Sequence, residues 1–354
     1  MRLKLNILLV TLLALLSCAK EGGGRVDYGP ETGNLCVRFD VSDMNPPILG
    51  VTQDNADAGH VLSEGSDGKM MIGRMWLVDK YNNVVVFRKT EENNSNSRIQ
   101  KFTNIKRGEY TLYILLNSTD LDGFTEGETI NDSFKKKCLA TITSGSSPEY
   151  TVESGVPCSI VKDVAIAAGK NYVDVSLQRC VGRLTVVVLN NIHDCKLAIG
   201  GIGLSAVNPS TGYYFPQSDG SVPEYANLAF HDLDYINHLV VLQPSRNKII
   251  FDRYVYETKD IPEGLSFRLF GAVYGDKKEP VISGTSFVGY DAVLPSDEIK
   301  INYIDDYGVS KLLTRIERNE HVTVSINVSY DREYMQFDFT VKAWVTKDNT
   351  TTFD

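Results

Sequence analysis

Cys18 is the residue whose neighbours most clearly favour a specific chemistry. It follows the tripeptide Leu15–Ser17, whose apolar and small side chains leave the adjoining peptide bond accessible to a peptidase. Its thiol is a nucleophile that can take a diacylglycerol group. Upstream, a mostly apolar run of twelve residues, Leu5–Leu16, follows the basic residues Arg2 and Lys4. A membrane-spanning helix needs about 20 apolar residues, so this run predicts a removable signal peptide rather than a permanent anchor.

This arrangement resembles the lipobox of bacterial lipoproteins, in which the signal peptide is removed and the cysteine becomes the acylated first residue. The resemblance implies that residues 1–17 are cleaved and that Cys18 carries lipid, such as palmitate, in the outer membrane. Each acyl chain contributes about 0.8 kcal/mol per buried CH₂ group, so several chains would hold the protein there permanently. The alternative is a plain secretory signal followed by a chance cysteine.

Residues 18–33 are predicted to form a flexible spacer, because Ala19–Gly33 contains five Gly and one Pro and offers few side chains to bury. Ala19–Glu21 resembles the surface-export signal of Bacteroidetes lipoproteins, which would place the body of the protein outside the cell.

The charge of the chain excludes one class of partner. The sequence has 36 basic and 45 acidic residues, a net charge of −9. Removal of Arg2 and Lys4 with the signal peptide leaves 34 basic residues against 45 acidic, or −11. We therefore predict no nucleic-acid partner, and a body that stands off an anionic membrane.

The sequence contains no recognisable catalytic motif. Gly284–Ser286 lacks the second glycine of a nucleophile elbow, and there is no Cys-x-x-Cys, His-Glu-x-x-His or phosphate-binding glycine loop. His231 and His238 flank two aspartates, and a loop begins at Asp120–Gly123, but solvated turns explain both better than a metal site. In that loop Thr129 stands where calcium would need a bidentate Glu. We predict no enzyme activity, no cofactor and no metal.

The cysteines beyond Cys18 do not suggest a disulfide framework. An odd number of them is spread through apolar segments, so buried thiols are the default expectation. One bridge, from Cys138 to Cys158, stays open in an exported protein. The remaining cysteines are Cys36, Cys138, Cys158, Cys180 and Cys195.

Beyond residue 33 the apolar residues recur with a period of two, which is typical of β-strands. The first predicted strand has an apolar face made by Leu35, Val37, Phe39 and Val41. The last two, around residues 322–328 and 335–345, show the clearest alternation. Short strands bounded by Gly, Asn, Asp and Pro favour an all-β chain of antiparallel sandwiches.

About 320 residues suit two such sandwiches of ordinary domain size. The predicted boundary lies near Gly182, where one strand leads directly into the next without a Pro/Ser linker. The predicted domains are residues 34–182 and residues 183–354, in tandem and fairly stiff.

Three short stretches resemble the fimbrial subunits of Bacteroidetes type V pili, the fimbrillin and FimB-like lipoproteins. They are Phe102–Tyr113, Val175–Leu184 and Ile316–Asn319. The resemblance covers most of residues 34–345. It implies two tandem transthyretin-like Greek-key β-sandwiches in a non-catalytic pilus subunit that mediates surface attachment. Its implied partners are other fimbrial subunits and a host protein or glycan.

In that family, a sandwich that lacks one strand accepts a strand from a neighbouring subunit. In stalk subunits, an Arg-directed protease removes the N-terminal strand, which here is the strand containing Leu35, Val37, Phe39 and Val41. No arginine lies between Phe39 and Gly73. We therefore expect an anchoring or accessory subunit that keeps this strand, with a protease-processed stalk pilin as the alternative.

An anchor would donate a C-terminal strand, and the resemblance makes the segment containing Phe339, Val341, Ala343 and Val345 a candidate donor. The same residues also fit an ordinary core strand. A different function class, a carbohydrate-binding surface lipoprotein, stays open because aromatic side chains can stack on sugars. Its candidate residues are Trp76, Trp344, Tyr213 and Tyr214.

Overall fold

The chain is built almost entirely of β-strands. The computed structural model describes residues 31–41, 72–90, 97–143, 148, 150, 155–205, 209–225, 230–232, 239–283, 286–304, 307–331 and 336–347. The described residues include one labelled helix, α2, which is the four-residue segment Asp132–Lys135. In the same ranges, no helix has the length and apolar character needed to cross a bilayer. The predicted all-β class is confirmed.

The first seven strands form one sheet in the order β3-β2-β5-β6-β7-β1-β4. Strands β6 and β7 pair only where Cys158 faces Arg179 and Ser159 faces Gln178. Beyond these two pairs the strands separate, so the sheet bends into two layers around a shared core. The bounds are Thr32–Val41 (β1), Gly73–Asp79 (β2), Val84–Thr90 (β3), Ser97–Lys106 (β4), Gly108–Leu116 (β5), Cys158–Ile166 (β6) and Gly169–Arg179 (β7).

The core of this N-terminal half, residues 31–181, takes one apolar face from each layer. Apolar side chains of β1 and β7 pack against apolar side chains of β2 and β5, as the period-two patterning of these strands requires. The buried set includes Leu35, Val37, Phe39, Met75, Leu77, Phe102, Leu112, Ile114, Leu116, Val175 and Leu177.

The later strands form two six-stranded sheets and one two-stranded sheet. The first contains β12-β8-β20-β21-β18-β19, and the second contains β10-β9-β13-β16 with β11 and β17. The two-stranded sheet is β14–β15. Their bounds are Gly182–Asn190 (β8), Cys195–Ser205 (β9), Phe230–Asp232 (β10), Val240–Leu242 (β11), Asn247–Val255 (β12), Ser266–Gly275 (β13), Val281–Ser283 (β14), Ser286–Val288 (β15), Ala292–Val293 (β16), Ile299–Lys300 (β17), Asn302–Ile304 (β18), Ser310–Leu312 (β19), Glu320–Asp331 (β20) and Gln336–Lys347 (β21).

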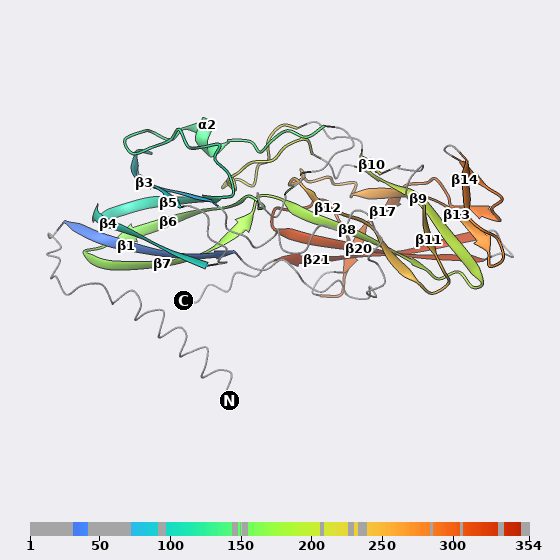
Figure 1. Ribbon diagram of the computed structural model, residues 1–354. Coiled ribbons are helices and arrows are strands. Elements are labelled where there is room, and N and C mark those ends of the chain that lie inside the picture. The colour runs from blue at the N-terminus through green and yellow to red at the C-terminus, as the bar shows by residue number, and fades with distance from the viewer. Residues whose placement is uncertain are drawn as a thin grey trace, which may run out of the picture.

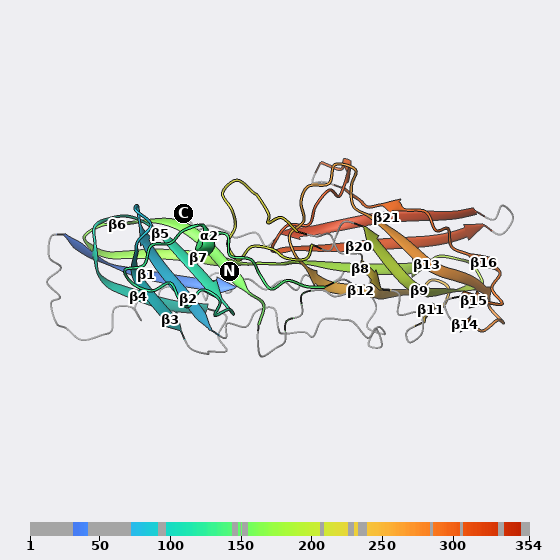
Figure 2. The ribbon, with the colours of Figure 1, turned by 90° about the horizontal axis from the view of Figure 1, so that it is seen from above.

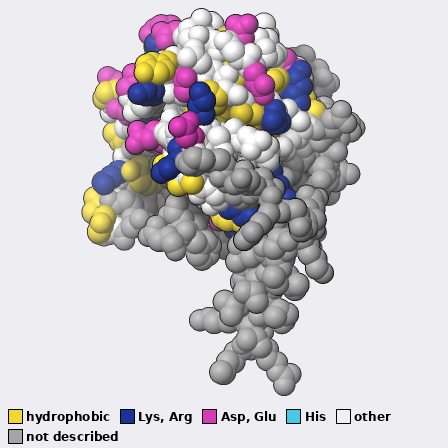
Figure 3. All heavy atoms as spheres, turned by 90° about the vertical axis from the view of Figure 1, so that its left-hand side faces the viewer, with side chains coloured by type: hydrophobic (Ala, Val, Ile, Leu, Met, Phe, Trp, Pro, Cys, Tyr) yellow, Lys and Arg dark blue, Asp and Glu magenta, His cyan; other side chains and the backbone are white. Residues whose placement is uncertain are grey.

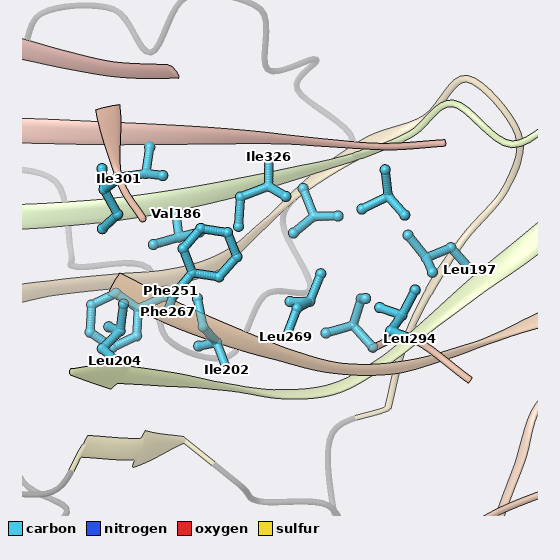
Figure 4. Packing of buried hydrophobic residues seen from close by; sticks show 14 of the residues in the cluster. Val186, Leu197, Ile202, Leu204, Phe251, Phe267, Leu269, Leu294, Ile301 and Ile326 are labelled. Atoms are coloured by element: carbon cyan, nitrogen blue, oxygen red, sulfur yellow. The ribbon is translucent and has the colours of Figure 1, made fainter. Parts of the chain in front are cut away.

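A second core fills the space between the two six-stranded sheets of this C-terminal half, residues 182–347. Figure 4 shows Val186, Phe251 and Ile326 of one sheet meeting Leu197, Phe267 and Leu269 of the other. Figures 1 and 2 show the two halves end to end along one long axis.

The change from one set of sheets to the other occurs between β7, which ends at Arg179, and β8, which begins at Gly182. A Cβ atom at Gly182 would lie 2.8 Å from the carbonyl oxygen of Glu317, so glycine permits a close approach of two backbones here. Gly182, the first residue of β8, is also the residue near which the sequence predicts the boundary between the two domains. The division into two independent domains, residues 34–182 and 183–354, stays a prediction.

A third buried cluster joins the halves. On the outer face of β2 and β5, Trp76 packs against Phe134 and Phe215, with ring centroids 5.0 and 6.4 Å away. Phe215 belongs to the C-terminal half, and Tyr254 and Tyr256 of that half lie in the same cluster. Backbone hydrogen bonds reinforce the contact, from the Leu139 N–H to the Gly212 oxygen and from the Tyr214 N–H to the Lys137 oxygen.

Candidate strand-complementation site

The predicted N-terminal strand lies inside its own sheet, as β1. It pairs antiparallel with β4 on one edge and parallel with β7 on the other. Leu35, for example, faces Phe102 on β4 and Asn171 on β7. The backbone groups on both edges of β1 are therefore occupied by strands of the same chain.

The apolar face of β1 fills the core of the N-terminal half. The side chains of Leu35, Val37 and Phe39 are 0%, 0% and 1% exposed. Full burial of side chains of this size stabilises a fold by about 1.5–3 kcal/mol each. The backbone of Val41 pairs with Leu177, while its side chain lies outside the described residues. Loss of β1 would open a groove with an apolar floor and unpaired backbone on both walls.

The start of β1 is fixed against the turn that connects β6 and β7. A Cβ atom at Gly33 would lie 2.0 Å from the carbonyl oxygen of Ala167, so only glycine fits. The Asn171 amide donates to the carbonyl oxygens of Asn34 and Ala167, at 3.2 and 2.9 Å. Because β1 runs parallel to β7, it begins at the end of the molecule that faces away from the C-terminal half (Figure 1).

The arginines nearest to the segment between β1 and β2 are both in strands. Arg38 lies within β1, where its Nε contacts the Asp174 carboxylate at 2.9 Å. Arg74 lies in β2, is 6% exposed and forms a bidentate pair with Asp122. Hydrogen bonding to Arg74 lowers the pKa of the Asp122 carboxyl. Proteases cut exposed, unpaired chain, so neither arginine is placed for cleavage in the folded protein.

The candidate donor strand is β21, which pairs antiparallel with β20 along its whole length. Phe339, Val341, Ala343 and Val345 face Val328, Ile326, Val324 and Val322 of β20. On its other edge, within the described chain, β21 meets β18 only where Ala343 faces Tyr303. The side chains of β21 lie outside the described residues. The backbone of β21 is therefore paired within the sheet of its own chain, as in an ordinary core strand.

The residues just before β20 lie at the junction of the halves. Arg318 bonds to other residues of the C-terminal half, while Asn319 bonds across to Arg179 of the N-terminal half. Periodicity gave no sign of either contact. The Arg318 guanidinium donates to the carbonyl oxygens of Tyr213 and Tyr214 and to the Glu257 carboxylate. Next to it, Asn319 Oδ1 accepts from the backbone N–H of Arg179 at 3.0 Å. The sequence signals were the Ile316–Asn319 stretch and the Val175–Leu184 stretch, which contains Arg179; both gave the family resemblance, and neither showed that they contact each other.

A buried polar chain crosses β12, β8 and β20 beside this point. Arg183 donates to both oxygens of Asp252, at 2.9 and 2.7 Å. The Thr185 hydroxyl donates to Asp252 and lies 2.8 Å from His321 Nε2, so Nε2 carries the proton that completes the chain. Among the described residues, His321 Nδ1 has no hydrogen-bond partner. Burial, with the positive charge of Arg183, lowers the pKa of His321 to about 4.

The aromatic residues considered for sugar stacking are mostly buried. Trp76 is 0% exposed, and its Nε1 donates to the Phe124 carbonyl oxygen at 2.7 Å. Tyr214 is 5% exposed, and its hydroxyl donates to Asp120. Tyr213 is half-buried, and the side chain of Trp344 lies outside the described residues. Trp76 and Tyr214 therefore cannot form a sugar-binding platform, because both rings serve the junction between the halves.

Two acidic side chains of the loop considered for a cation are already paired with basic side chains of the protein. Asp122 is paired with Arg74 and Lys89, and Glu126 is paired with Arg88. Within the described ranges, no three His, Cys, Asp or Glu residues gather as a metal site would require. His231 is in β10, and His238 lies outside these ranges.

The five cysteines in the described part of the chain form no disulfide. The bridge left open between Cys138 and Cys158 is thus not formed; Cys158 Sγ is instead 3.4 Å from the Val156 carbonyl oxygen in the buried core. Cys18, the predicted lipidation site, lies outside the described residues.

Comparisons by sequence identify no relative. The chain matches no protein-family model, and no curated protein is similar enough to count as a match. Any likeness to known proteins must therefore be sought in the fold.

Comparison of the fold finds clear counterparts among solved structures. A protein assigned to cell adhesion in Parabacteroides distasonis ATCC 8503 superposes with a TM-score of 0.52 at 13% identity, covering 90% of this chain and 98% of that one. A fimbrilin (FimA) from Porphyromonas gingivalis W83 has the same TM-score and identity, with 90% and 100% covered. A Bacteroides eggerthii DSM 20697 protein assigned to cell adhesion gives 0.50 at 13% identity, with 91% and 99% covered.

These matches span nearly the whole length of each chain, so the likeness is to the complete architecture and not to one sheet. This chain has the fold of Bacteroidetes fimbrial and cell adhesion proteins, and the resemblance inferred from the three sequence stretches is confirmed at the level of the fold. The proteins compared are described as fimbrial or adhesive and not as enzymes.

Proposed function

We propose that this chain is a non-catalytic subunit of a surface fimbrium, anchored in the outer membrane by lipid on Cys18, that keeps its own N-terminal strand. The observation that carries the proposal is the position of β1, paired on both edges and buried along its apolar face. A subunit in this state cannot accept a partner's strand at β1. It suits an anchoring or accessory position in the fimbrium better than the stalk.

The arginine positions support retention of β1. Between Phe39 and Gly73 the chain has no arginine, while Arg38 and Arg74 lie in paired strands. An Arg-directed protease can cut before β1, at Arg25, without removing the strand. Such a cut would separate β1 from Cys18, so it would release the protein from the membrane but leave the sheet complete.

Donation of β21 to a neighbouring subunit is the weaker part of the anchor role. The strand would have to leave all twelve of its pairings with β20, which would uncover the apolar residues of β20. We therefore propose attachment to the fimbrium through another surface. Contact with a host protein or glycan stays a prediction.

The test is the mass and N-terminus of the mature protein in its own outer membrane. Taking about 110 Da per residue, removal of the signal peptide from the 39.3 kDa chain leaves about 37 kDa before lipid is added. We expect this mass, a blocked and acylated Cys18, and recovery in a high-mass complex with other pilins. A mature chain that starts after Arg38, at about 35 kDa, would instead place the protein among processed stalk pilins.

Two variants make the result interpretable. Cys18→Ser removes the lipid-accepting thiol and is expected to release the protein from the membrane. Gln53→Arg places an arginine between β1 and β2, so a cut there would show that the protease reaches this protein when a site is offered. If Gln53→Arg is cut and the unsubstituted chain is not, retention of β1 is a property of this sequence.

A further inference from the structure

The strand that follows the predicted lipid tether also lies beside the connection between the two halves. β1 pairs parallel with β7 over nine residues of each strand. β7 leads through Cys180 and Val181 into β8, which belongs to the C-terminal half. A pull on the start of β1 therefore reaches the C-terminal half by crossing from β1 to β7 and then following the chain through β8 (Figure 1).

β7 has little other backbone pairing within its own half. It pairs with β6 at only two positions, where Cys158 faces Arg179 and Ser159 faces Gln178. In the order of the sheet β7 lies between β6 and β1, so β1 supplies most of the backbone pairing that holds β7 in the N-terminal half. Tension along β7 and β8 is therefore resisted mainly by the pairing of β1 with β7.

The direction of such a pull suits this pairing. β1 and β7 both run from the outer end of the N-terminal half toward the junction, and the two halves lie along one axis (Figures 1 and 2). Tension between the start of β1 and the far end of β8 thus acts along the strands. Hydrogen bonds between strands lie across that direction, so they are all loaded at once, whereas a sideways pull opens them one after another. A lengthwise pull should need the larger force.

Gly33 keeps β1 from slipping along its neighbours under a lengthwise pull. A strand can slip by two residues and form the same hydrogen bonds again, because a slip of two keeps its apolar face toward the core. Here a two-residue slip toward the tether would bring Leu35 to the place of Gly33. A Cβ atom in that place lies 2.0 Å from the carbonyl oxygen of Ala167, so the slip is blocked.

Hydrogen bonds also fix the point where the tether enters the fold. The carbonyl oxygen of Glu31 accepts from the Arg107 N–H at 2.9 Å, and Asn34 Oδ1 accepts from the Asn104 N–H at 3.1 Å. These donors belong to β4 and to the turn that follows it. The first residues of β1 are therefore held on the β4 side as well as on the β7 side.

The surface at this end of the molecule is mixed in charge. Figure 3 shows basic and acidic side chains close together on its described part. Arg38 of β1 and Asp174 of β7 form an ion pair across the two strands, at 2.9 Å. A surface of mixed sign has little attraction for anionic headgroups. The tether, rather than this surface, is therefore the connection through which force enters the protein.

Resting on the proposed lipid anchor at Cys18, we propose that β1 is a mechanical clamp. It transfers tension from the tether to β7, and through β8 to the C-terminal half, while its hydrogen bonds to both neighbours are loaded together. A subunit anchored in this way holds a fimbrium against a pull without losing β1. Retention of β1 then does more than complete the sheet, because removal of the strand would break the link between membrane and body.

The experiment compares two pulling directions on one protein by single-molecule force spectroscopy. The chain from Cys18 to Asp354 carries an attachment tag in place of the lipid. The second attachment point is an azide-bearing amino acid, either at His193 in the exposed turn after β8 or at Lys170, which is exposed on β7 and faces Asn34. A pull at His193 acts along the strands, and a pull at Lys170 acts across them.

We expect the rupture force along the strands to be at least about twice the force across them at the same loading rate. Both measurements break the same pairs between β1 and β7, so they differ in direction and not in the stability of the fold. Equal forces in the two directions would overturn the proposal, because β1 would then open pair by pair under a lengthwise pull.

Two matched variants locate the resistance. Val37→Ala and Val324→Ala make the same change at buried valines, 0% and 1% exposed, on β1 and β20. Of the two, only Val37 lies on the path from the tether to His193. We expect Val37→Ala to lower the force along the strands and Val324→Ala to leave it unchanged. An equal decrease in both would place the resistance outside β1 and contradict the clamp.

Failure of the proposed function looks different from failure of the clamp. A mature chain without lipid on Cys18 has no tether to load, so the clamp falls together with the proposed function even when the forces differ with direction. A lipidated chain that is found in high-mass pilin complexes, but ruptures at the same force in both directions, overturns the clamp alone.

Discussion

The first and last described strands of the chain are used differently, although both alternate apolar and polar residues. β1 lies between two strands, parallel to β7 and antiparallel to β4, and is paired along nearly its whole length on both sides. β21 is fully paired with β20 on one side and meets β18 at a single position on the other. Loss of β1 would leave a two-walled groove, whereas loss of β21 would leave a one-sided edge.

This difference shows which strand suits exchange between subunits. A two-walled groove lets an incoming strand satisfy backbone groups on both edges and fill the core face, so the exchange can be nearly neutral in free energy. A strand that docks on a one-sided edge forms backbone hydrogen bonds with one neighbour only, which is half of those contacts. Removal or retention of β1 is therefore the feature that would distinguish an acceptor from a subunit that needs no partner strand.

The largest effect is expected from a charge placed in the core face of β1. Val37 is 0% exposed, so Val37→Asp buries a carboxylate without a partner and should cost more than about 4 kcal/mol. We expect the N-terminal half to lose its protection in hydrogen exchange followed by mass spectrometry. Ile99→Asp on the neighbouring β4, at a side chain that is 41% exposed, is the control and should change little.

Val324→Asp sharpens the comparison from the other side. Val324 on β20 faces Ala343 of β21 and is 1% exposed, so this variant should unprotect the C-terminal half first. If Val37→Asp and Val324→Asp unprotect the same strands, the two halves unfold as one unit and the comparison between β1 and β21 does not hold.

Acid should weaken the sheet that holds β21 and spare the one that holds β1. The pKa of His321, on β20, is about 4 in the folded protein, below the ordinary histidine value of 6.5. The unfolded chain therefore binds the proton more readily. The stability that His321 contributes is complete above pH 6.5 and is lost as the pH falls toward 4, by up to about 3 kcal/mol.

The measurement is the pH dependence of unfolding between pH 4 and pH 7, resolved by strand through hydrogen exchange. His321→Gln keeps a donor for Thr185 and should remove the acid loss in the C-terminal half. His193→Gln, at an exposed turn, should leave it unchanged. None of the five histidines lies in strands β1 to β7, so an equal acid loss in that sheet would contradict the assignment to His321.

A smaller effect is expected where β1 begins. Gly33→Ala places a Cβ atom 2.0 Å from the Ala167 carbonyl oxygen, and relief of this contact should cost about 1–3 kcal/mol. Gly123→Ala is the matched control, because nothing lies within 4 Å of its added Cβ. Thermal unfolding should separate the two variants; equal melting temperatures would mean that β1 is not held at its start.

The comparison between β1 and β21 could be predicted from the sequence only where it depends on the alternation of apolar and polar residues along a strand. β1 and β20 each bury one face, so the period of two in Leu35, Val37 and Phe39 and in Val322 to Val328 is visible without a structure. The same alternation in β21 could not show whether the strand is donated or kept. That depends on pairing with β20, and a pattern within one strand carries no information about its partners.

Features built from irregular segments could not be predicted in this way. Trp76 and Tyr214 are far apart in sequence and meet only because residues 137–142 and 210–214 pair across the junction. The sequence predicted a solvated turn around Asp122, and its ion-pair partner, Arg74, is 48 residues away in β2. Such contacts have no period, so the sequence alone left sugar stacking open for Trp76 and Tyr214 and could not assign Asp122 to an ion pair.

The smallest effect concerns the arginine inside β1. Arg38 and Asp174 form an ion pair whose side chains are 45% and 69% exposed, and such pairs contribute about 0–1 kcal/mol. Arg38→Ala should therefore change the melting temperature by only a degree or two in low salt and by less in high salt. In cells, the mature N-terminus should stay the same, because we propose that Arg38 is not a processing site. A shift of the N-terminus in Arg38→Ala would show that β1 is normally cut, and the retained strand would then be only a precursor state.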